Sequence, residues 1–538
     1  MKKIFFLFYA LLFLKGSAVL FAQNNSCTHR YQARYFDSIQ VIRDIVYTKE
    51  APKVIAAALG VETISRRDLK MDIFMPPISD TVVKRPVVIL AHGGGFVDIA
   101  FMGGTLLVGT MHNEDIQALA DTLAHWGFVA ASIEYRTGFD MLSTTSVKRA
   151  VWRGSQDMSA AIRFFRKNAS VFKIDTEKVF IGGSSAGAFA AIHATFVDGD
   201  ERIAESHHQT AIVMTDLGEL HSRPIVSINN TNDFSGVSAL GNDVDSIANG
   251  VVGYWGAIAD TAMFRGNNKA PIIMFHGDED AVVDIDCARP FSGILFTAPT
   301  TCGSRIMNEA LNRLNLPHEY YMAEGEGHEY WGVTNGMWGS NGPNAFWSDM
   351  IAKTTSFIYD LMRPNTPRVN GEMIVNLNNI YTYTVGNYTA DYKYCWEVTN
   401  GTIIAQQNNS ITIQWNSNNI GYFNIIAVDA AQTKSNTAYY QVTVNQNVSI
   451  NEFAINTAAF KLFPNPNNGN FYIATNSLPQ EQVIFQIFDV QGRLVHEENY
   501  TFQGEENFQI QTQNLAQGLY TIRAIAEDYL SIQKLIIQ

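Results

Sequence analysis

The stretch IGGSSAGAFAAIHATF (residues 181–196) places two adjacent serines in a run of glycine and alanine. It follows a predicted apolar strand and opens a predicted helix of small residues. A serine nucleophile needs a sharp, uncrowded turn at the end of a strand, and the pattern G-x-S-x-G between a strand and a helix provides one. The segment GSSAG fits this pattern with Ser185 at its centre. We therefore expect Ser185 to be the nucleophile and Ser184 to serve packing or the turn.

A second glycine-rich segment, HGGGF (residues 92–96), ends an earlier predicted strand. Consecutive glycines let bare backbone approach a substrate carbonyl, and their N–H groups can stabilise a developing oxyanion. We expect Gly94, Gly95 and Ala186 to be these donors and His92 to be structural. The alternative is a phosphate-binding loop, but neither G-x-G-x-x-G nor a Lys-Ser/Thr signature accompanies these glycines.

A serine hydroxyl also needs a general base that a carboxylate orients. His318 begins a predicted strand, and His328 lies in the loop after it. In an open parallel sheet the site lies at the carboxyl ends of the strands. Only one of the two histidines can lie at that edge, so we expect His328 to be the base.

The segment HGDEDAVVD (residues 276–284) follows a buried predicted strand and offers several carboxylates. The loop position suits Asp280 best. Asp278 and Asp284 remain alternatives, and Glu279 is expected to face solvent. The resulting chain order, Ser then Asp then His, is that of one hydrolase architecture.

Mixed α/β periodicity extends from about residue 31 to residue 362. Strands are predicted at 66–77, 86–96, 128–136, 179–182, 271–277 and 318–325, and helices at 113–126, 147–172 and 344–362. Alternating strands and helices predict a doubly wound, mostly parallel sheet. The proline-bearing segment RPNTPRV (residues 363–369) is a predicted linker that few contacts cross. Short alternating strands then predict two all-β sandwiches, at 370–447 and 459–538, with Trp396 buried in the first.

The 538 residues carry a formal net charge of −13, which argues against nucleic acid as a partner. Residues 1–22 have the basic start, apolar run and small-residue end of a signal peptide, and no later segment has transmembrane length. The protein is therefore expected to be exported through the periplasm.

Cys287 and Cys302 could pair in an oxidising compartment, whereas Cys27 and Cys395 are expected to be unpaired.

Together, HGGGF, GSSAG, HGDED and GEGH (residues 325–328) resemble the carboxylesterase and lipase-like members of the α/β-hydrolase fold. The resemblance covers residues 44–362 and implies ester hydrolysis without a cofactor or metal. It also favours Asp280, because esterases place the acid in H-G-x-x-D before an apolar pair. The aromatic, glycine-rich insertion at 330–347 departs from the family pattern. It either packs the closing helix or forms a substrate wall.

The segments LFPNP, NGNFYI, FDVQGRLV and GLYTIR of residues 459–538 resemble the C-terminal sorting domain of the Bacteroidetes type IX secretion system, whose machinery would be a partner. Residues 370–447 resemble a PKD-type or immunoglobulin-like sandwich.

The leading hypothesis is a secreted serine carboxylesterase (residues 23–364) acting on small or polymer-linked esters, feruloyl or acetyl esters of polysaccharides among them. One alternative is a prolyl-oligopeptidase-like peptidase, which the HGGG loop disfavours. Another is a glycan-binding adhesion protein with an inert hydrolase domain.

Overall fold

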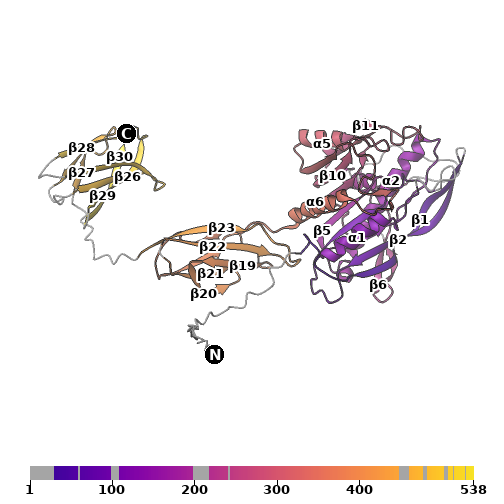
Figure 1. Ribbon diagram of the computed structural model, residues 1–538, viewed down its shortest axis with the longest axis horizontal. Helices are drawn as coiled ribbons and strands as arrows, with labels where there is room; N and C mark the ends of the chain where they lie inside the picture. The colour runs from indigo at the N-terminus through magenta and orange to yellow at the C-terminus, as the bar shows by residue number, and fades with distance from the viewer. Residues whose placement is uncertain are drawn as a thin grey trace, which may run out of the picture.

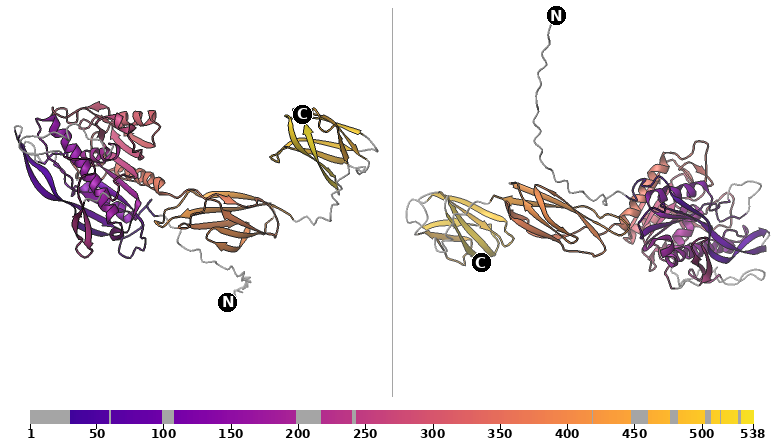
Figure 2. Two further views of the ribbon diagram at one scale, coloured as in Figure 1. Left: turned by 180° about the vertical axis from the view of Figure 1, so that it is seen from behind. Right: turned by 90° about the horizontal axis from the view of Figure 1, so that it is seen from below.

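The computed structural model describes residues 30–58, 61–98, 108–197, 217–239, 243–417, 419–446, 460–475, 482–501, 507–512, 514–526 and 529–538. The predicted signal peptide and Cys27 lie outside these residues. The described chain forms an α/β unit at one end, a middle β unit, and a C-terminal β unit at the other end (Figures 1 and 2). None of the described helices has the length and apolarity needed to cross a membrane.

The α/β unit is built on an eight-stranded sheet with the order β1-β2-β4-β3-β5-β8-β10-β13. The strands from β4 to β13 in this order pair in parallel. β1 and β2 form an antiparallel edge. This is the doubly wound, mostly parallel arrangement of the α/β-hydrolase fold. The strands are β1 (Gln40–Ala58), β2 (Val61–Met75), β3 (Arg85–Ala91), β4 (Val129–Ile133), β5 (Ile174–Ser184), β8 (Gly250–Tyr254), β10 (Ile272–Gly277) and β13 (His318–Ala323).

Helices cover both faces of the sheet. The side chains of β3 alternate between the two apolar cores that these helices form with the sheet. Val87 and Ile89 point into one core, and Val88 and Leu90 into the other, as the two-residue period of a strand requires. One face packs against α2, α4 and α5, and the other against α1 and α6. The helices are α1 (Glu114–Trp126), α2 (Thr144–Lys167), α3 (Ala169–Phe172), α4 (Ala186–Phe196), α5 (Ser304–Arg313) and α6 (Ala345–Met362), with the short 3₁₀ turn η3 (Thr261–Arg265).

The helix predicted at 147–172 is broken at Asn168, between α2 and α3. The Asn168 side chain donates to the carbonyl oxygens of Phe164 and Val226 and accepts from the Ile228 amide. These bonds tie the end of α2 to β6. The helices predicted at 113–126 and 344–362 are confirmed, and Gly127, with φ 111°, ends the first of them.

Small antiparallel sheets lie outside the main sheet. Cys287 and Cys302 form a disulfide that joins β11 to β12. Cys395 is also disulfide-bonded, so the prediction of a free thiol there is wrong. The small elements are β6 (Ile225–Asn230) with β7 (Ser235–Ala239), β9 (Ala257–Ile258) with β12 (Thr301–Gly303) and β11 (Cys287–Ala288), and β14 (Val333–Thr334) with β15 (Met337–Trp338).

The middle and C-terminal units each pair two sheets around one apolar core, as predicted for β-sandwiches. Trp396 is buried in the first core. The middle unit contains β16 (Val369–Asn370), β17 (Ile374–Asn376), β18 (Ile380–Val385), β19 (Lys393–Thr399), β20 (Gly401–Gln407), β21 (Ser410–Trp415), β22 (Asn419–Val428) and β23 (Ala438–Asn445). The C-terminal unit contains β24 (Phe460–Phe463), β25 (Asn470–Thr475), β26 (Gln482–Phe488), β27 (Leu494–Thr501), β28 (Asn507–Gln511), β29 (Gly518–Ala526) and β30 (Tyr529–Ile537).

Contacts join the α/β unit to the loop between β22 and β23, although the sequence predicts a linker that few contacts cross. The Tyr31 hydroxyl donates to the Ala431 carbonyl oxygen at 2.6 Å. Lys178 pairs with Asp429, and their side chains are 14% and 8% exposed. Tyr359 and Arg363, near the end of α6, bind Lys434 and Asn436. The middle unit is therefore docked on the α/β unit rather than only tethered to it.

We predict that Lys178→Met lowers the free energy of unfolding of the α/β unit. Removing one partner of a buried ion pair costs about 3–5 kcal/mol, and the low end applies because Asp429 keeps its bonds from Thr433. The control is Lys353→Met on α6, whose partner Asp349 is 53% exposed. An exposed pair is worth about 0–1 kcal/mol. Equal destabilisation of the two variants in denaturant titrations would contradict the docking argument.

Candidate functional site

Ser185 occupies a strained turn between β5 and α4. Its backbone has φ 51° and ψ −116°, a conformation that L-residues rarely adopt. A Cβ atom at Gly183 would lie 2.5 Å from the Ala91 carbonyl oxygen, and one at Gly187 would lie 2.1 Å from the same atom. Only glycine fits at either position. The GSSAG segment therefore forms the sharp strand-to-helix turn that the sequence predicts.

The structure brings Ser185, His328 and Asp280 together from three different loops. His328 Nε2 lies 3.0 Å from Ser185 Oγ. His328 Nδ1 lies 2.7 Å from Asp280 Oδ2. If Nδ1–H donates to the carboxylate, the Nε2 lone pair is left to accept the serine hydroxyl. This is the geometry that general-base activation of a hydroxyl requires.

Asp280 is held as an anion by several donors. Its Oδ1 accepts the backbone N–H groups of Val282 and Val283, each at 2.8 Å. Its Oδ2 faces both His328 and His276. Burial alone would raise the pKa of Asp280, but the hydrogen bonds from the two histidines outweigh it and hold the pKa well below its ordinary value.

The other carboxylates of this segment bind elsewhere. Asp278 accepts the Gly325 amide, and Asp284 accepts the Asp286 amide. His318 lies at the start of β13, where it contacts the Leu316 carbonyl oxygen and Asn308. Among the expected alternatives, only Asp280 and His328 are in contact with each other.

Ser184 and His92 also have structural partners. Ser184 is fully buried, and its Oγ accepts the Trp255 indole N–H at 3.1 Å. The His92 ring stacks on Tyr135, whose hydroxyl donates to the His92 carbonyl oxygen. These contacts agree with the structural roles expected from the sequence.

Two of the three expected oxyanion donors, Gly95 and Ala186, lie at the same cavity as Ser185. Gly94 and Gly95 both have positive φ angles, 107° and 60°, which bend the HGGG loop. Gly95 and Ala186 line the same cavity as Ser185, whereas Gly94 is not among its lining residues. Ala186 is the first residue of α4, where a backbone N–H has no partner within the helix.

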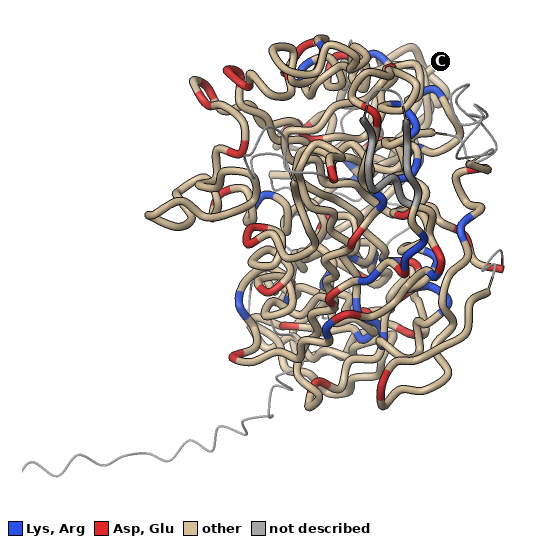
Figure 3. The backbone as a smooth tube through the Cα atoms, turned by 90° about the vertical axis from the view of Figure 1, so that its right-hand side faces the viewer, with Lys and Arg blue, Asp and Glu red and all other residues tan. Residues whose placement is uncertain are grey.

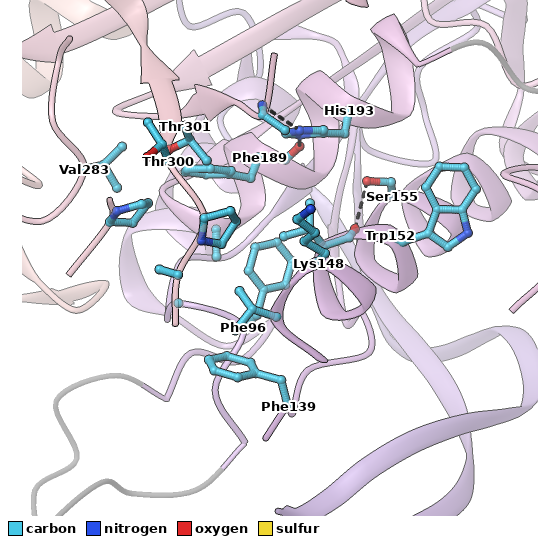
Figure 4. A pocket seen from close by; sticks show the side chains of 18 of the residues that line it. Phe96, Phe139, Lys148, Trp152, Ser155, Phe189, His193, Val283, Thr300 and Thr301 are labelled. Carbon is cyan, nitrogen blue, oxygen red and sulfur yellow. Dashed lines mark hydrogen bonds between the residues drawn. The ribbon is translucent and has the colours of Figure 1, made fainter. Parts of the chain in front are cut away.

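A cavity of about 340 Å³ extends from Ser185 between α2, α4 and the loops after β9 and β11. Its described lining is mostly apolar. In the close-up, Val283 and Trp152 lie toward opposite sides, with Phe96, Phe139 and Phe189 between them (Figure 4). Pockets of this size and character hold small organic ligands, typically about 300–1,000 Å³. The cavity can therefore take an apolar group attached to the reacting carbonyl.

The aromatic insertion at 330–347 packs the core rather than this cavity. Trp331 and Trp347 contact each other with ring centroids 5.0 Å apart, and Tyr330 contacts Phe346 at the same distance. None of these rings is among the described lining residues. Of the two roles left open by the sequence, the structure shows packing against α6.

Two residues of the site escaped the sequence analysis. His276 is fully buried and within 3.3 Å of Asp280 Oδ2, and Ser304 binds its other ring nitrogen. Glu329, next to His328, accepts the amides of Asn335 and Gly336 and so ties down the histidine loop. Burial raises the pKa of Glu329. His276 stands in the HGDED segment, which could have drawn attention to it; no comparable signal marks Glu329.

Outside the candidate site, positively and negatively charged side chains both occur along the described chain. Basic and acidic residues are interspersed over the view in Figure 3. Among the described residues, no group of three or more His, Cys, Asp or Glu side chains is arranged to hold a metal ion.

Comparison with known proteins gives two family matches. Residues 71–295 match the family described as BD-FAE. Residues 461–538 match the secretion system C-terminal sorting domain. The second match indicates export and a secreted or cell-surface location.

Curated relatives are similar over part of the chain. Carboxylesterase 3B of Mus musculus is 32% identical over 161 residues, which are 29% of this chain and 26% of that protein. Juvenile hormone esterase of Heliothis virescens is 29% identical over 145 residues, 27% of this chain and 23% of that protein. The chain thus spans about a quarter of the length of these relatives.

Solved structures of esterase 2 from Thermogutta terrifontis are also similar. The propionate-bound form has 18% sequence identity and a TM-score of 0.35, and covers 58% of this chain and 95% of its own. The form phosphonylated by cyclosarin has the same identity and TM-score, and covers 58% of this chain and 94% of its own.

His193 lines the cavity, and its burial makes the free energy of unfolding depend on pH. Its Nδ1 lies 2.8 Å from the Phe189 carbonyl oxygen, and its Nε2 accepts the Ala259 amide at 3.0 Å. Burial lowers the pKa of His193 to about 4. In the unfolded chain a histidine titrates near 6.5. The stabilisation from a neutral His193 is therefore complete above about pH 6.5 and is lost as the pH falls toward 4.

We predict that His193→Gln flattens the dependence of unfolding free energy on pH between about 6.5 and 4. One group contributes at most about 1.4 kcal/mol per pH unit in that window. Thermal or denaturant unfolding at a series of pH values measures it. The control is His112→Gln, whose side chain is 58% exposed. An unchanged slope in His193→Gln would contradict the role of this ring.

Proposed function

We propose that this chain, with a BD-FAE family match in its α/β unit and a sorting domain at its C-terminus, is an exported serine esterase that hydrolyses carboxylic esters. The observation that carries the proposal is the hydrogen-bonded chain from Ser185 through His328 to Asp280. Ser185 lines a mostly apolar cavity together with Gly95 and Ala186.

In the proposed mechanism, Ser185 Oγ attacks the ester carbonyl carbon while His328 Nε2 takes the serine proton. Asp280 stays ionised and stabilises the imidazolium that forms. The N–H groups of Gly95 and Ala186, with Gly94 in the same turn, stabilise the tetrahedral oxyanion. His328 then gives its proton to the leaving alcohol, and an acyl-enzyme remains. A water molecule, deprotonated by His328, releases the acid and restores Ser185.

The cavity supports a bulky acyl group in the natural substrate. A volume of about 340 Å³ exceeds what an acetyl group fills, and the lining aromatic rings suit a planar, apolar group. The sequence analysis considered feruloyl and acetyl esters of polysaccharides. An aromatic acyl group such as feruloyl fits this cavity better than an acetyl group does. The alcohol part of the substrate would lie outside the cavity.

We predict that Ser185→Ala lowers kcat for 4-nitrophenyl acetate by about 10⁴-fold or more, because removal of the nucleophile leaves only binding and oxyanion stabilisation. The matched control is Ser184→Ala, which deletes the adjacent hydroxyl and its bond to Trp255 but leaves the reacting atoms. It should retain most of the activity. Loss of turnover in Ser184→Ala together with full activity in Ser185→Ala would reject the assignment. Absence of turnover by the wild type on any short ester would reject the function.

For the C-terminal unit, we predict that deletion of residues 459–538 leaves esterase activity intact and retains the enzyme in the periplasm. The candidate site lies wholly in the α/β unit, and the sorting unit is read by the secretion machinery rather than by substrate. Fractionation of the producing cells, with activity assayed in each fraction, tests this. Truncated enzyme that still reaches the surface or the medium would contradict it.

A further inference from the structure

The segment between the two cysteines of the α/β unit forms one wall of the cavity. We call residues 288–301 the disulfide loop. Its two ends are joined by the Cys287–Cys302 bond and by pairing of β11 with β12, which in turn pairs with β9. Thr297 Oγ1 donates to the Met141 carbonyl oxygen at 2.6 Å and ties the loop to the segment before α2. The loop is therefore anchored at its ends and at its centre.

The loop has an inner and an outer face. Leu295 and Ala298 are buried and, with Phe291, line the cavity. Phe296, between them in sequence, is 75% exposed and does not line it. The chain thus carries two phenylalanines in one loop, one at the cavity and one at the surface.

Phe291 lies where the loop meets the oxyanion glycines. A Cβ atom at Gly95 would be 3.2 Å from two carbons of the Phe291 ring. Phe291 has φ 53°, and its amide donates at 2.9 Å to the carbonyl oxygen of Val282, two residues after the acid Asp280. The ring therefore lies against the oxyanion loop, and its backbone is bonded to the acid loop.

This position determines what the ring can contact during ester hydrolysis. The carbonyl carbon must bond to Ser185 Oγ, and its oxygen must approach the Gly95 N–H. The next carbon of the acyl group, the α-carbon, is one bond further into the cavity, beside the wall that Phe291 forms. In that arrangement, substituents on the α-carbon would contact the Phe291 ring, which lies against Gly95.

We propose that Phe291 determines acyl specificity by excluding acids branched at the α-carbon, so that the substrates are esters of acids that are unbranched or planar next to the carbonyl. This inference rests on the proposed esterase function. It assigns no chemical step to Phe291, which acts through steric contact with the bound acyl group.

The test compares kcat/KM for 4-nitrophenyl butyrate with that for 4-nitrophenyl pivalate. The two esters share a leaving group, and the α-carbon carries one ethyl group in butyrate and three methyl groups in pivalate. The intrinsic reactivities of the two esters are the same for every variant. Comparing the butyrate-to-pivalate ratio between variants therefore removes their contribution. Phe291→Ala should lower the ratio about tenfold or more, since one or two methyl groups in a tight pocket change kcat/KM by about 10–200-fold.

Phe296→Ala is the matched control, with the same substitution in the same loop, and should leave the ratio at the wild-type value. Phe291→Leu retains an apolar side chain and should lower the ratio less than Phe291→Ala does. If circular dichroism shows that Phe291→Ala is unfolded, the ratio measured for Phe291→Leu tests the inference in its place. A ratio unchanged in a folded Phe291 variant would overturn the inference and leave the esterase function intact. Turnover of neither ester by the wild type would overturn the function itself.

Discussion

The close approach of α4 to the end of β3 is the constraint on which the candidate site depends. Gly183 and Gly187 both lie against the Ala91 carbonyl oxygen, at distances that admit no side chain. With the helix start pressed onto the sheet, the chain can pass from strand to helix only through a residue with positive φ. That residue is Ser185. Its strained backbone is stabilised by the packing around it, and its hydroxyl is directed toward His328.

A second constraint fixes the acid. Asp280 Oδ1 is occupied by two backbone N–H groups of its own turn, so the carboxyl group cannot rotate freely, and Oδ2 is left for His328. His276 Nε2 lies 3.3 Å from the same oxygen, and Nδ1 of this ring is bound by Ser304, the first residue of α5. Ser304 follows β12, which carries Cys302. The disulfide therefore braces the segment that supports the acid as well as the loop that lines the cavity.

The parts of the site that depend on local sequence could be predicted, and those that depend on distant contacts could not. The position of Ser185 in the strand-to-helix turn follows from a pattern of five residues, so the sequence predicts it. Asp280 needed the family resemblance, because three consecutive acidic residues look alike until a turn orients one of them. The role proposed for Phe291 depends on its contact with Gly95, almost two hundred residues earlier. The packing of the 330–347 insertion depends on α6 and β8, and β8 itself was not recognised because its sequence, GVVGY, is short and rich in glycine.

The same distinction explains the arrangement of the units. Composition separates the α/β unit from the β-sandwiches, but docking at the Asp429 loop joins residues about 250 positions apart, such as Lys178 and Asp429. Lys178 lies seven residues before Ser185 on β5, about 23 Å along the strand at 3.3 Å per residue. The middle unit thus contacts the amino ends of the parallel strands, whereas the candidate site lies at their carboxyl ends. The docked sandwich therefore lies at the end of the α/β unit opposite the candidate site.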